Sequence, residues 1–136
     1  MNNKINPAKI ILQEIKLVKK IFSVLGRNNV FFVGGVVRNF LLNEPLEDID
    51  LAVKLNSEEV KKILSKNKIK FLDLSKGHGT VTVISKSNSI EITSMRIDKE
   101  TYGRKAKVEF VADIFLDSCR RDFTINSIYL NYDGEF

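Results

Sequence analysis

The sequence predicts an α+β domain with α/β-like element order, in which a mixed β-sheet is flanked by helices. Short apolar runs alternate with segments of helical spacing, and glycine or proline stands at the ends of several of them. The chain has 136 residues, of which 43% are hydrophobic and 29% charged. This composition suits one globular domain with a modest core.

The first half of the chain is expected to alternate helices with strands. Apolar residues at helical spacing with lysines between them predict an amphipathic N-terminal helix, which Gly26 ends. The expected elements are a helix over 8–25, a strand over 30–33, a helix over 36–42, a strand over 49–55, a helix over 57–67 and a strand over 69–74.

The second half is expected to contain mainly strands. Residues 80–85 and 90–95 form a hairpin around the polar turn SKSNS. Segment 97–107 is polar and basic, and we expect a mobile loop there. Alternating apolar residues over 128–132 predict a last strand before the turn signal Asp133-Gly134.

Charge and cysteine content indicate the compartment and the kind of partner. The net charge of +5 and the pI near 9.3 are compatible with a phosphate-bearing partner, and many ordinary proteins share them. The single cysteine, Cys119, cannot form an internal disulfide, and MNNKINPAKI is unlike a signal peptide. No apolar run approaches the roughly eighteen residues needed to cross a bilayer. We therefore expect a cytoplasmic protein with no membrane partner.

Asp48 and Asp50 stand two apart in an otherwise apolar run. On a strand their side chains share one face, roughly 6–7 Å apart, while Ile49 and Leu51 point into the core. Two such carboxylates repel unless a cation lies between them, and hard oxygen ligands suit Mg²⁺. The alternative is a solvated pair on an edge strand.

Gly34-Gly35 lies between the expected strand and helix, where the backbone can bend sharply and approach an anion. Arg38 follows on the first helical turn, from which it could reach a phosphate. A glycine pair alone is usually an ordinary turn. The order of glycine turn, arginine and two carboxylates within seventeen residues favours a nucleotide site.

Four ordered segments carry a resemblance to a known family. They are GGVVRNFLLNEPLEDIDLAV, HGTVTV at 78–83, IEITSMR at 90–96 and DSCRRDFTINSIYLNYDG at 117–134. The first resembles G-G-x-V-R-D…D-I-D-L, and the last resembles D-L-x-R-R-D-F-T-I-N-A, of the class II tRNA nucleotidyltransferase and bacterial poly(A) polymerase family. The resemblance covers residues 30–136, the family's catalytic head. Residues 1–29 are expected to add an amphipathic helix packed on that head.

The resemblance implies roles for individual residues. Asp48 and Asp50 would be the catalytic residues and hold Mg²⁺, with Glu91 as a candidate third ligand or, alternatively, an exposed strand residue. The implied nucleotide-binding residues are Gly34, Gly35, Arg38, Arg121, Asp122 and Asn126. Arg121 and Asp122 have an alternative reading, a surface ion-pair cluster with Arg120.

The resemblance also implies a reaction. The head would add CMP and AMP from CTP and ATP to tRNA 3′ ends by two-metal phosphoryl transfer, with poly(A) addition as the alternative. The family's helical neck, body and tail domains are expected to be absent from this protein, and a separately encoded body or tail domain is expected as a partner. Asn39 replaces the usual aspartate, which favours a second alternative, a non-catalytic remnant that binds nucleotide or RNA. A small nucleotidyltransferase acting on a protein or an antibiotic fits the R-R-D-F-T-I-N segment poorly.

Five further residues have open interpretations. Asp117 matches a family position and is a candidate to orient one of the arginines. Arg96 and Arg104 are either contacts to phosphate or RNA or solvated loop cations. His78 is the only histidine, so we expect no zinc site. Cys119 is expected to be buried or inert, because no histidine is adjacent to activate it.

Overall fold

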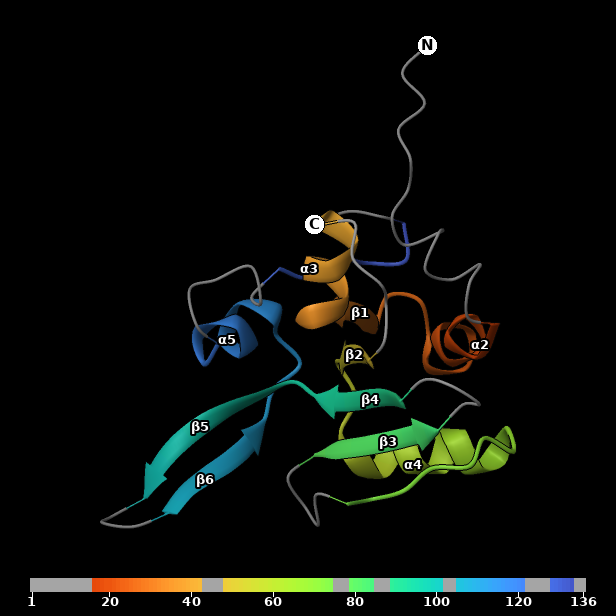
Figure 1. Cartoon of the computed structure of the whole chain (residues 1–136). Coiled ribbons are helices and arrows are strands. Elements are labelled where there is room, and N and C mark those ends of the chain that lie inside the picture. Colours follow the sequence, from red (N-terminus) through yellow and green to blue (C-terminus); the bar gives the residue numbers. More distant parts are fainter. Residues whose placement is uncertain are drawn as a thin grey trace.

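The structure is a computed structural model that describes residues 16–42, 48–74, 79–84, 89–101, 105–121 and 128–133. Figure 1 shows the arrangement of its elements. In chain order they are α2 (Lys16–Leu25), β1 (Val30–Val33), α3 (Gly35–Leu41), β2 (Asp48–Val53), α4 (Ser57–Lys66), β3 (Thr80–Ile84), β4 (Ser89–Ser94), β5 (Arg96–Thr101), β6 (Lys105–Phe110) and α5 (Ile114–Cys119).

Four strands form a mixed sheet in the order β1-β2-β4-β3. The inner strands β2 and β4 run parallel, while β1 and β3 are antiparallel to their neighbours. A parallel pair needs a crossover connection, and α4 lies in the segment that joins β2 to the β3–β4 pair. The expected α+β class, with a mixed sheet flanked by helices, is confirmed.

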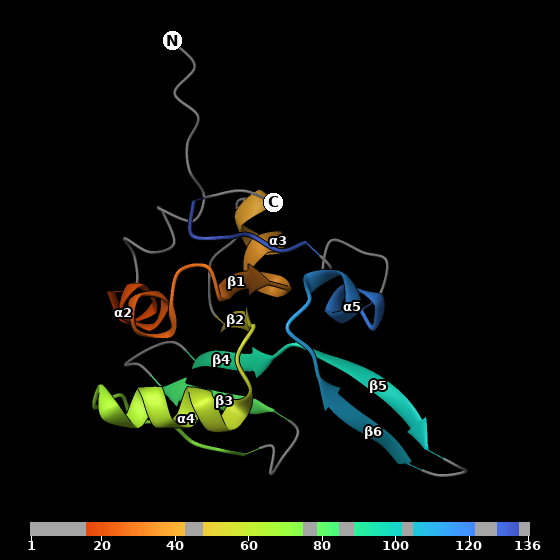
Figure 2. The same cartoon turned by 180° about the vertical axis from the view of Figure 1, so that it is seen from behind.

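Helices α2 and α4 cover one face of this sheet, as Figures 1 and 2 show from opposite sides. Helix α4 begins at the N-cap Asn56, whose side-chain oxygen accepts a 2.9 Å hydrogen bond from the backbone N–H of Glu59. The main core lies between these helices and the sheet. Its fully buried residues include Val18, Ile21, Phe22, Phe32, Ile49, Leu51, Leu64, Val81, Ile90, Ile92 and Leu130.

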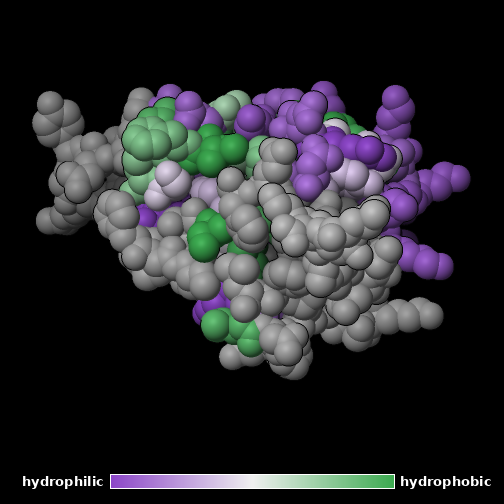
Figure 3. Space-filling model, turned by 90° about the horizontal axis from the view of Figure 1, so that it is seen from above, coloured by the Kyte–Doolittle hydropathy of each residue, from purple (hydrophilic) through white to green (hydrophobic). Residues whose placement is uncertain are grey.

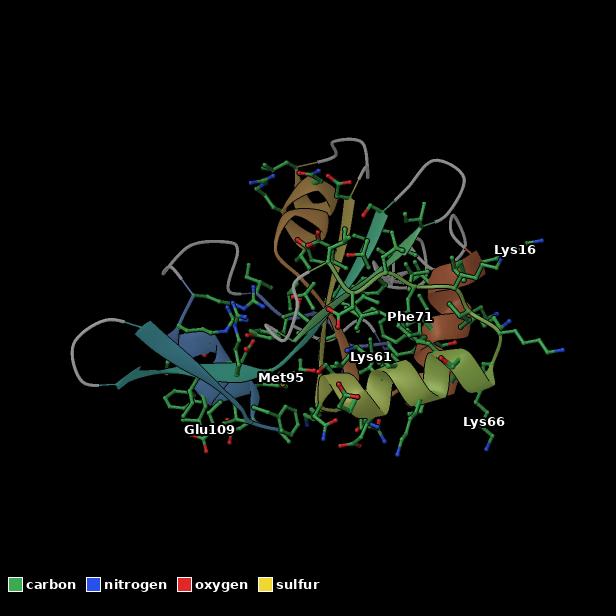
Figure 4. All side chains as sticks on the ribbon, turned by 90° about the horizontal axis from the view of Figure 1, so that it is seen from below. Lys16, Lys61, Lys66, Phe71, Met95 and Glu109 are labelled. Carbon is green, nitrogen blue, oxygen red and sulfur yellow. The ribbon has the colours of Figure 1, made fainter. Side chains whose placement is uncertain are left out.

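The outer surfaces of α2 and α4 are rich in lysine. Lys16 and Lys66 project away from the body of the molecule in Figure 4, and Lys19, Lys20 and Lys62 are also exposed. Figure 3 shows hydrophilic side chains projecting from the end of the molecule where α2 lies. The polar faces of both helices are therefore solvated, as their amphipathic pattern requires.

The opposite face of the sheet is only partly covered. A smaller cluster of Val33, Ala52, Met95 and Tyr129 packs there, with Ile114 of α5 against it. Met95 lies where the four-stranded sheet meets the β5–β6 ribbon (Figure 4). Among the described residues, polar side chains that include Asp50, Glu91 and Thr93 line the remainder of this face.

The expected loop over 97–107 is wrong. Strands β5 and β6 form an antiparallel ribbon from Arg96↔Phe110 to Thr101↔Lys105, and Figure 1 shows this ribbon extending away from the sheet. A ribbon is held by main-chain hydrogen bonds, which polar sequences form as readily as apolar ones. Polarity alone therefore misidentified the segment.

Two other expected strands are reduced to single bridges, Leu72↔Thr82 and Phe32↔Leu130. The first half of the helix expected over 8–25 lies outside the described residues, and its second half is α2. Helix α5 was not anticipated, although Asp113 caps it by accepting a 3.0 Å hydrogen bond from the backbone of Leu116. In the described part of the chain, no helix is long and apolar enough to span a membrane.

Candidate functional site

Strand β2 places two carboxylates on the open face of the sheet. Ile49 and Leu51 are fully buried in the main core, whereas Asp48 is exposed and Asp50 is half-buried. The period of two therefore separates acidic from apolar side chains as the sequence predicts. Both carboxylates point away from α2 and α4.

Glu91 lies beside Asp50, because β2 and β4 run parallel with these two residues in register. Neighbouring strands are about 4.7–4.9 Å apart, so the two acidic side chains share one small area of the sheet face. Burial raises the pKa of Asp50 to about 6, with Glu91 and Asp48 adding to the shift and the charge of Arg121 opposing it. Such a site is electrostatically prepared for a cation.

The turn between β1 and α3 requires glycine. Gly34 has a φ of +68°, and a Cβ atom there would lie 3.2 Å from Oδ2 of Asp50. Helix α3 begins at Gly35, and Arg38 lies exposed on it, with its Nε atom donating a 3.3 Å hydrogen bond to Oδ1 of Asn39. The backbone thus passes directly beside a carboxylate of β2.

These elements form a cleft of about 510 Å³. Its lining contains Gly34, Gly35, Arg38, Asp48, Asp50 and Arg121, together with Asn39. Four of the predicted nucleotide-binding residues and both predicted catalytic carboxylates therefore meet in one cleft, although Arg121 is distant from the rest in sequence. Two cationic side chains and two carboxylates line the same cleft, which can hold a metal-bound polyphosphate.

A smaller cleft of about 190 Å³ adjoins the first and shares Asp50 and Arg121 with it. Its other polar lining residues are Thr80, Glu91, Thr93, Arg96 and Arg120. Sequence reasoning missed the two threonines, whose side chains are joined by a 3.1 Å hydrogen bond. The sequence TVTV in β3 was the available signal, because burial of both valines places Thr80 and Thr82 on the opposite face, where the clefts lie.

The side chain of Arg121 is held in place by a buried carboxylate. Asp117 is fully buried and accepts hydrogen bonds from Nε of Arg120 at 3.0 Å and Nε of Arg121 at 3.3 Å. Burial raises the pKa of Asp117, but hydrogen bonds from Tyr129 and the Arg96 backbone and the two arginine charges outweigh it, so the pKa lies below its ordinary value. The carboxylate is therefore ionised beneath the clefts.

The metal-binding expectation rests on the donor set. Asp48 and Asp50 present hard oxygen ligands in an open cleft, and Glu91 stands next to Asp50. Across the described ranges, no three histidine, cysteine or acidic side chains form a ready-made metal cage. Mg²⁺ usually takes only one or two carboxylates and completes its shell with water and phosphate, so the residues fit it.

Several predicted residues fall elsewhere. Asp122, Asn126, His78 and Arg104 lie outside the described residues. Cys119 is exposed at the end of α5, so of the two expectations, a buried or an inert thiol, the first does not hold: α5 turns Asp117 inward instead.

Comparison with known proteins gives one consistent result. A family model described as the poly A polymerase head domain matches residues 30–136. A CCA-adding enzyme from Lactobacillus delbrueckii subsp. bulgaricus is 42% identical over 107 residues, covering 77% of this chain and 26% of the enzyme. The mitochondrial CCA tRNA nucleotidyltransferase 1 of Danio rerio is 40% identical over 103 residues, covering 74% of this chain and 24% of that protein.

Solved structures of a CCA-adding enzyme and of a tRNA nucleotidyltransferase are also similar to the chain. The Bacillus stearothermophilus CCA-adding enzyme in complex with CTP superposes with a TM-score of 0.72 and 34% identity, over 90% of this chain and 28% of that one. A tRNA nucleotidyltransferase complexed with a primer tRNA and an incoming ATP analog gives 0.58 and 27%, over 79% and 30%. The chain thus spans about a quarter of the length of the curated relatives it matches.

Proposed function

Because the chain belongs to the family of poly(A) polymerase head domains, we propose that it is the catalytic head of an RNA nucleotidyltransferase that adds CMP and AMP to tRNA 3′ ends. The observation that carries this proposal is the larger cleft, which Asp48 and Asp50 line together with Arg38 and Arg121. Metal-binding oxygens and phosphate-binding cations in one cleft are what nucleotidyl transfer requires.

Each residue has a defined task in this proposal. Asp48 and Asp50, with Glu91 beside them, would hold Mg²⁺. When bound, the metal supplies acidification of the RNA 3′-hydroxyl and neutralisation of charge on the departing pyrophosphate. Arg38 and Arg121 would bind phosphate oxygens of CTP or ATP and orient the α-phosphate toward the hydroxyl.

The glycine turn completes the proposed nucleotide site. Gly34 and Gly35 keep the cleft free of side-chain atoms where the backbone passes Asp50, so a phosphate can approach closely. By the resemblance, Asp122 and Asn126 would contact the nucleotide and its ribose.

A transfer assay tests the proposal. The protein is incubated with a tRNA that lacks its terminal CCA, labelled CTP or ATP, and Mg²⁺, with and without a body domain supplied separately. We expect label to enter the RNA, and Asp48→Ala and Asp50→Ala to abolish incorporation while Glu58→Ala, an exposed carboxylate on α4, leaves it unchanged. Failure of the unmodified protein under both conditions would refute the catalytic assignment.

Two outcomes of this assay separate the alternatives. Incorporation of ATP alone, in long tracts, would indicate poly(A) addition. Binding of ATP or CTP without incorporation would indicate a non-catalytic remnant, which is favoured by Asn39 in the lining of the cleft. Asparagine has the shape of aspartate without its charge, so it cannot bind a metal or pair with Arg38 as strongly.

A further inference from the structure

One buried carboxylate gathers four hydrogen-bond donors behind the clefts. Oδ1 of Asp117 accepts from the backbone N–H of Arg96 at 3.0 Å and from Nε of Arg120 at 3.0 Å. Oδ2 accepts from Nε of Arg121 at 3.3 Å and from the hydroxyl of Tyr129. The carboxylate has no exposed surface, so it serves this network rather than the solvent.

Tyr129 connects the network to the sheet. The backbone of the next residue, Leu130, exchanges hydrogen bonds of 2.8 and 2.9 Å with Phe32 of β1. The Tyr129 ring is 8% exposed and packs edge-on against Phe31, with the ring centres 6.4 Å apart. Both its backbone and its ring are therefore fixed, so the position of its hydroxyl is fixed as well.

The Tyr129 hydroxyl has two partners at once. It donates to Oδ2 of Asp117 and accepts a 3.1 Å hydrogen bond from Nε of Arg121. Burial, together with the hydrogen bond to Asp117, raises the pKa of Tyr129 to about 12, so the hydroxyl keeps its proton at neutral pH. Nε of Arg121 thus lies between two acceptors, one of which is a neutral phenol.

These hydrogen bonds determine which nitrogens of the Arg121 guanidinium can point toward the clefts. A guanidinium normally prefers a bidentate pair with a carboxylate, which would turn its terminal nitrogens toward Asp117. Oδ1 already accepts two hydrogen bonds and Oδ2 accepts the one from Tyr129, so Arg121 makes a single contact, with its Nε atom, to the shared oxygen Oδ2. Its terminal nitrogens are then the part that can reach the cleft lining, where its charge acts on Asp50.

We propose that Tyr129 is a positioning residue that, through Asp117 and Nε of Arg121, orients the Arg121 guanidinium for a triphosphate. The role of the triphosphate rests on the proposed function, whereas the fixed Nε contact does not. Without the hydroxyl, Nε of Arg121 loses one of its two acceptors, and the guanidinium is free to turn toward Asp117 and withdraw from the cleft.

The test compares Tyr129→Phe with Tyr132→Phe. Tyr132 is a partly buried tyrosine in the same segment, but its ring packs against Phe22 on the main-core side, 5.8 Å between centres. Each variant therefore loses one hydroxyl group, and only Tyr129→Phe removes a contact to Arg121. Two measurements are made on each protein: the NMR signal of the Arg121 Nε–H, with its exchange rate, and the affinity for magnesium-bound ATP and for magnesium tripolyphosphate.

We expect Tyr129→Phe to shift the Nε–H signal of Arg121 and to speed the exchange of that proton with solvent. The affinity for both phosphate ligands should fall about three- to tenfold. Tyr132→Phe should leave both measurements unchanged. In an Arg121→Lys background, which lacks the Nε contact and the planar fork, Tyr129→Phe should cost no further affinity.

Three results would overturn the inference: an unchanged Nε–H signal in Tyr129→Phe, equal phosphate affinity for both tyrosine variants, or an additive loss in the Arg121→Lys background. If the unmodified protein bound neither phosphate ligand, the proposed function would fail first. The Nε–H signal would then decide by itself whether Tyr129 fixes Arg121.

Discussion

Replacing Gly34 with alanine should damage the proposed metal site through one added methyl group. The φ of +68° at this position disfavours a side chain and costs alanine about 1–2 kcal/mol. The new Cβ atom would also lie 3.2 Å from Oδ2 of Asp50, so the carboxylate must shift by a few tenths of an ångström. Mg²⁺ requires near-ideal octahedral geometry, and we expect its affinity to fall about tenfold.

Gly79→Ala is the matched control. Gly79 has a similar φ of +83°, but a Cβ atom there meets only the Cβ of Ser94, at an ordinary distance of 3.7 Å. Both variants should therefore lose about 1–2 kcal/mol of stability, a fall in Tm of about 3–10 °C. The metal affinity is measured by titration with Mn²⁺ in place of Mg²⁺, and only Gly34→Ala should bind Mn²⁺ more weakly.

The reasoning would be refuted if the two alanine variants bound Mn²⁺ equally well at a temperature where both are folded. It would also fail if Gly34→Ala unfolded at the same temperature as the unmodified protein, because the backbone strain would then be absent.

Three further predictions follow from burial and charge. Phe32→Ala should reduce the free energy of unfolding by about 3–5 kcal/mol in a urea titration, because the side chain is fully buried in the main core. Asp117 has a pKa below its ordinary value, so the stability that its carboxylate contributes is complete above about pH 4 and is lost as the pH falls through the lowered pKa. Thermal unfolding measured at a series of pH values should show this loss. Asp117→Asn should remove this part of the pH dependence. Asp50→Asn should raise stability by about 1–2 kcal/mol in metal-free buffer at pH 7, because it relieves the burial of a charge beside Glu91; a lower Tm in EDTA would contradict this.

Local patterns predicted the positions of the two carboxylates in the cleft. Alternation in β2 was enough to place Asp48 and Asp50 on one face, because burial of Ile49 and Leu51 fixes the phase of the strand. The glycine pair was sufficient for the β1–α3 turn, since few residues tolerate the φ found at Gly34. Neighbours along the chain decide both features, so no long-range information was needed.

Sequence reasoning failed where long-range pairing decides the structure. The β5–β6 ribbon looks like a loop because its main-chain ladder leaves no hydrophobic pattern. The expected last strand is one bridge between Phe32 and Leu130, although its alternation correctly separates Leu130 in the main core from Tyr129 in the smaller cluster. Asp117 was expected to orient one of the arginines, and only the docking of α5 shows that its carboxylate is fully buried and bonded to both Arg120 and Arg121.

The two sides of the cleft therefore depend on different physical causes. The carboxylates of Asp48 and Asp50 are fixed by a strand inside the main core, which the whole domain stabilises. The guanidinium of Arg121 is held by a six-residue helix and a short segment that makes a single bridge to β1. Short elements with few backbone pairings open at lower free energy than core strands do. The Arg121 side of the cleft should therefore be the more adjustable one, and Tyr129 lies at the point where that side is attached to the sheet.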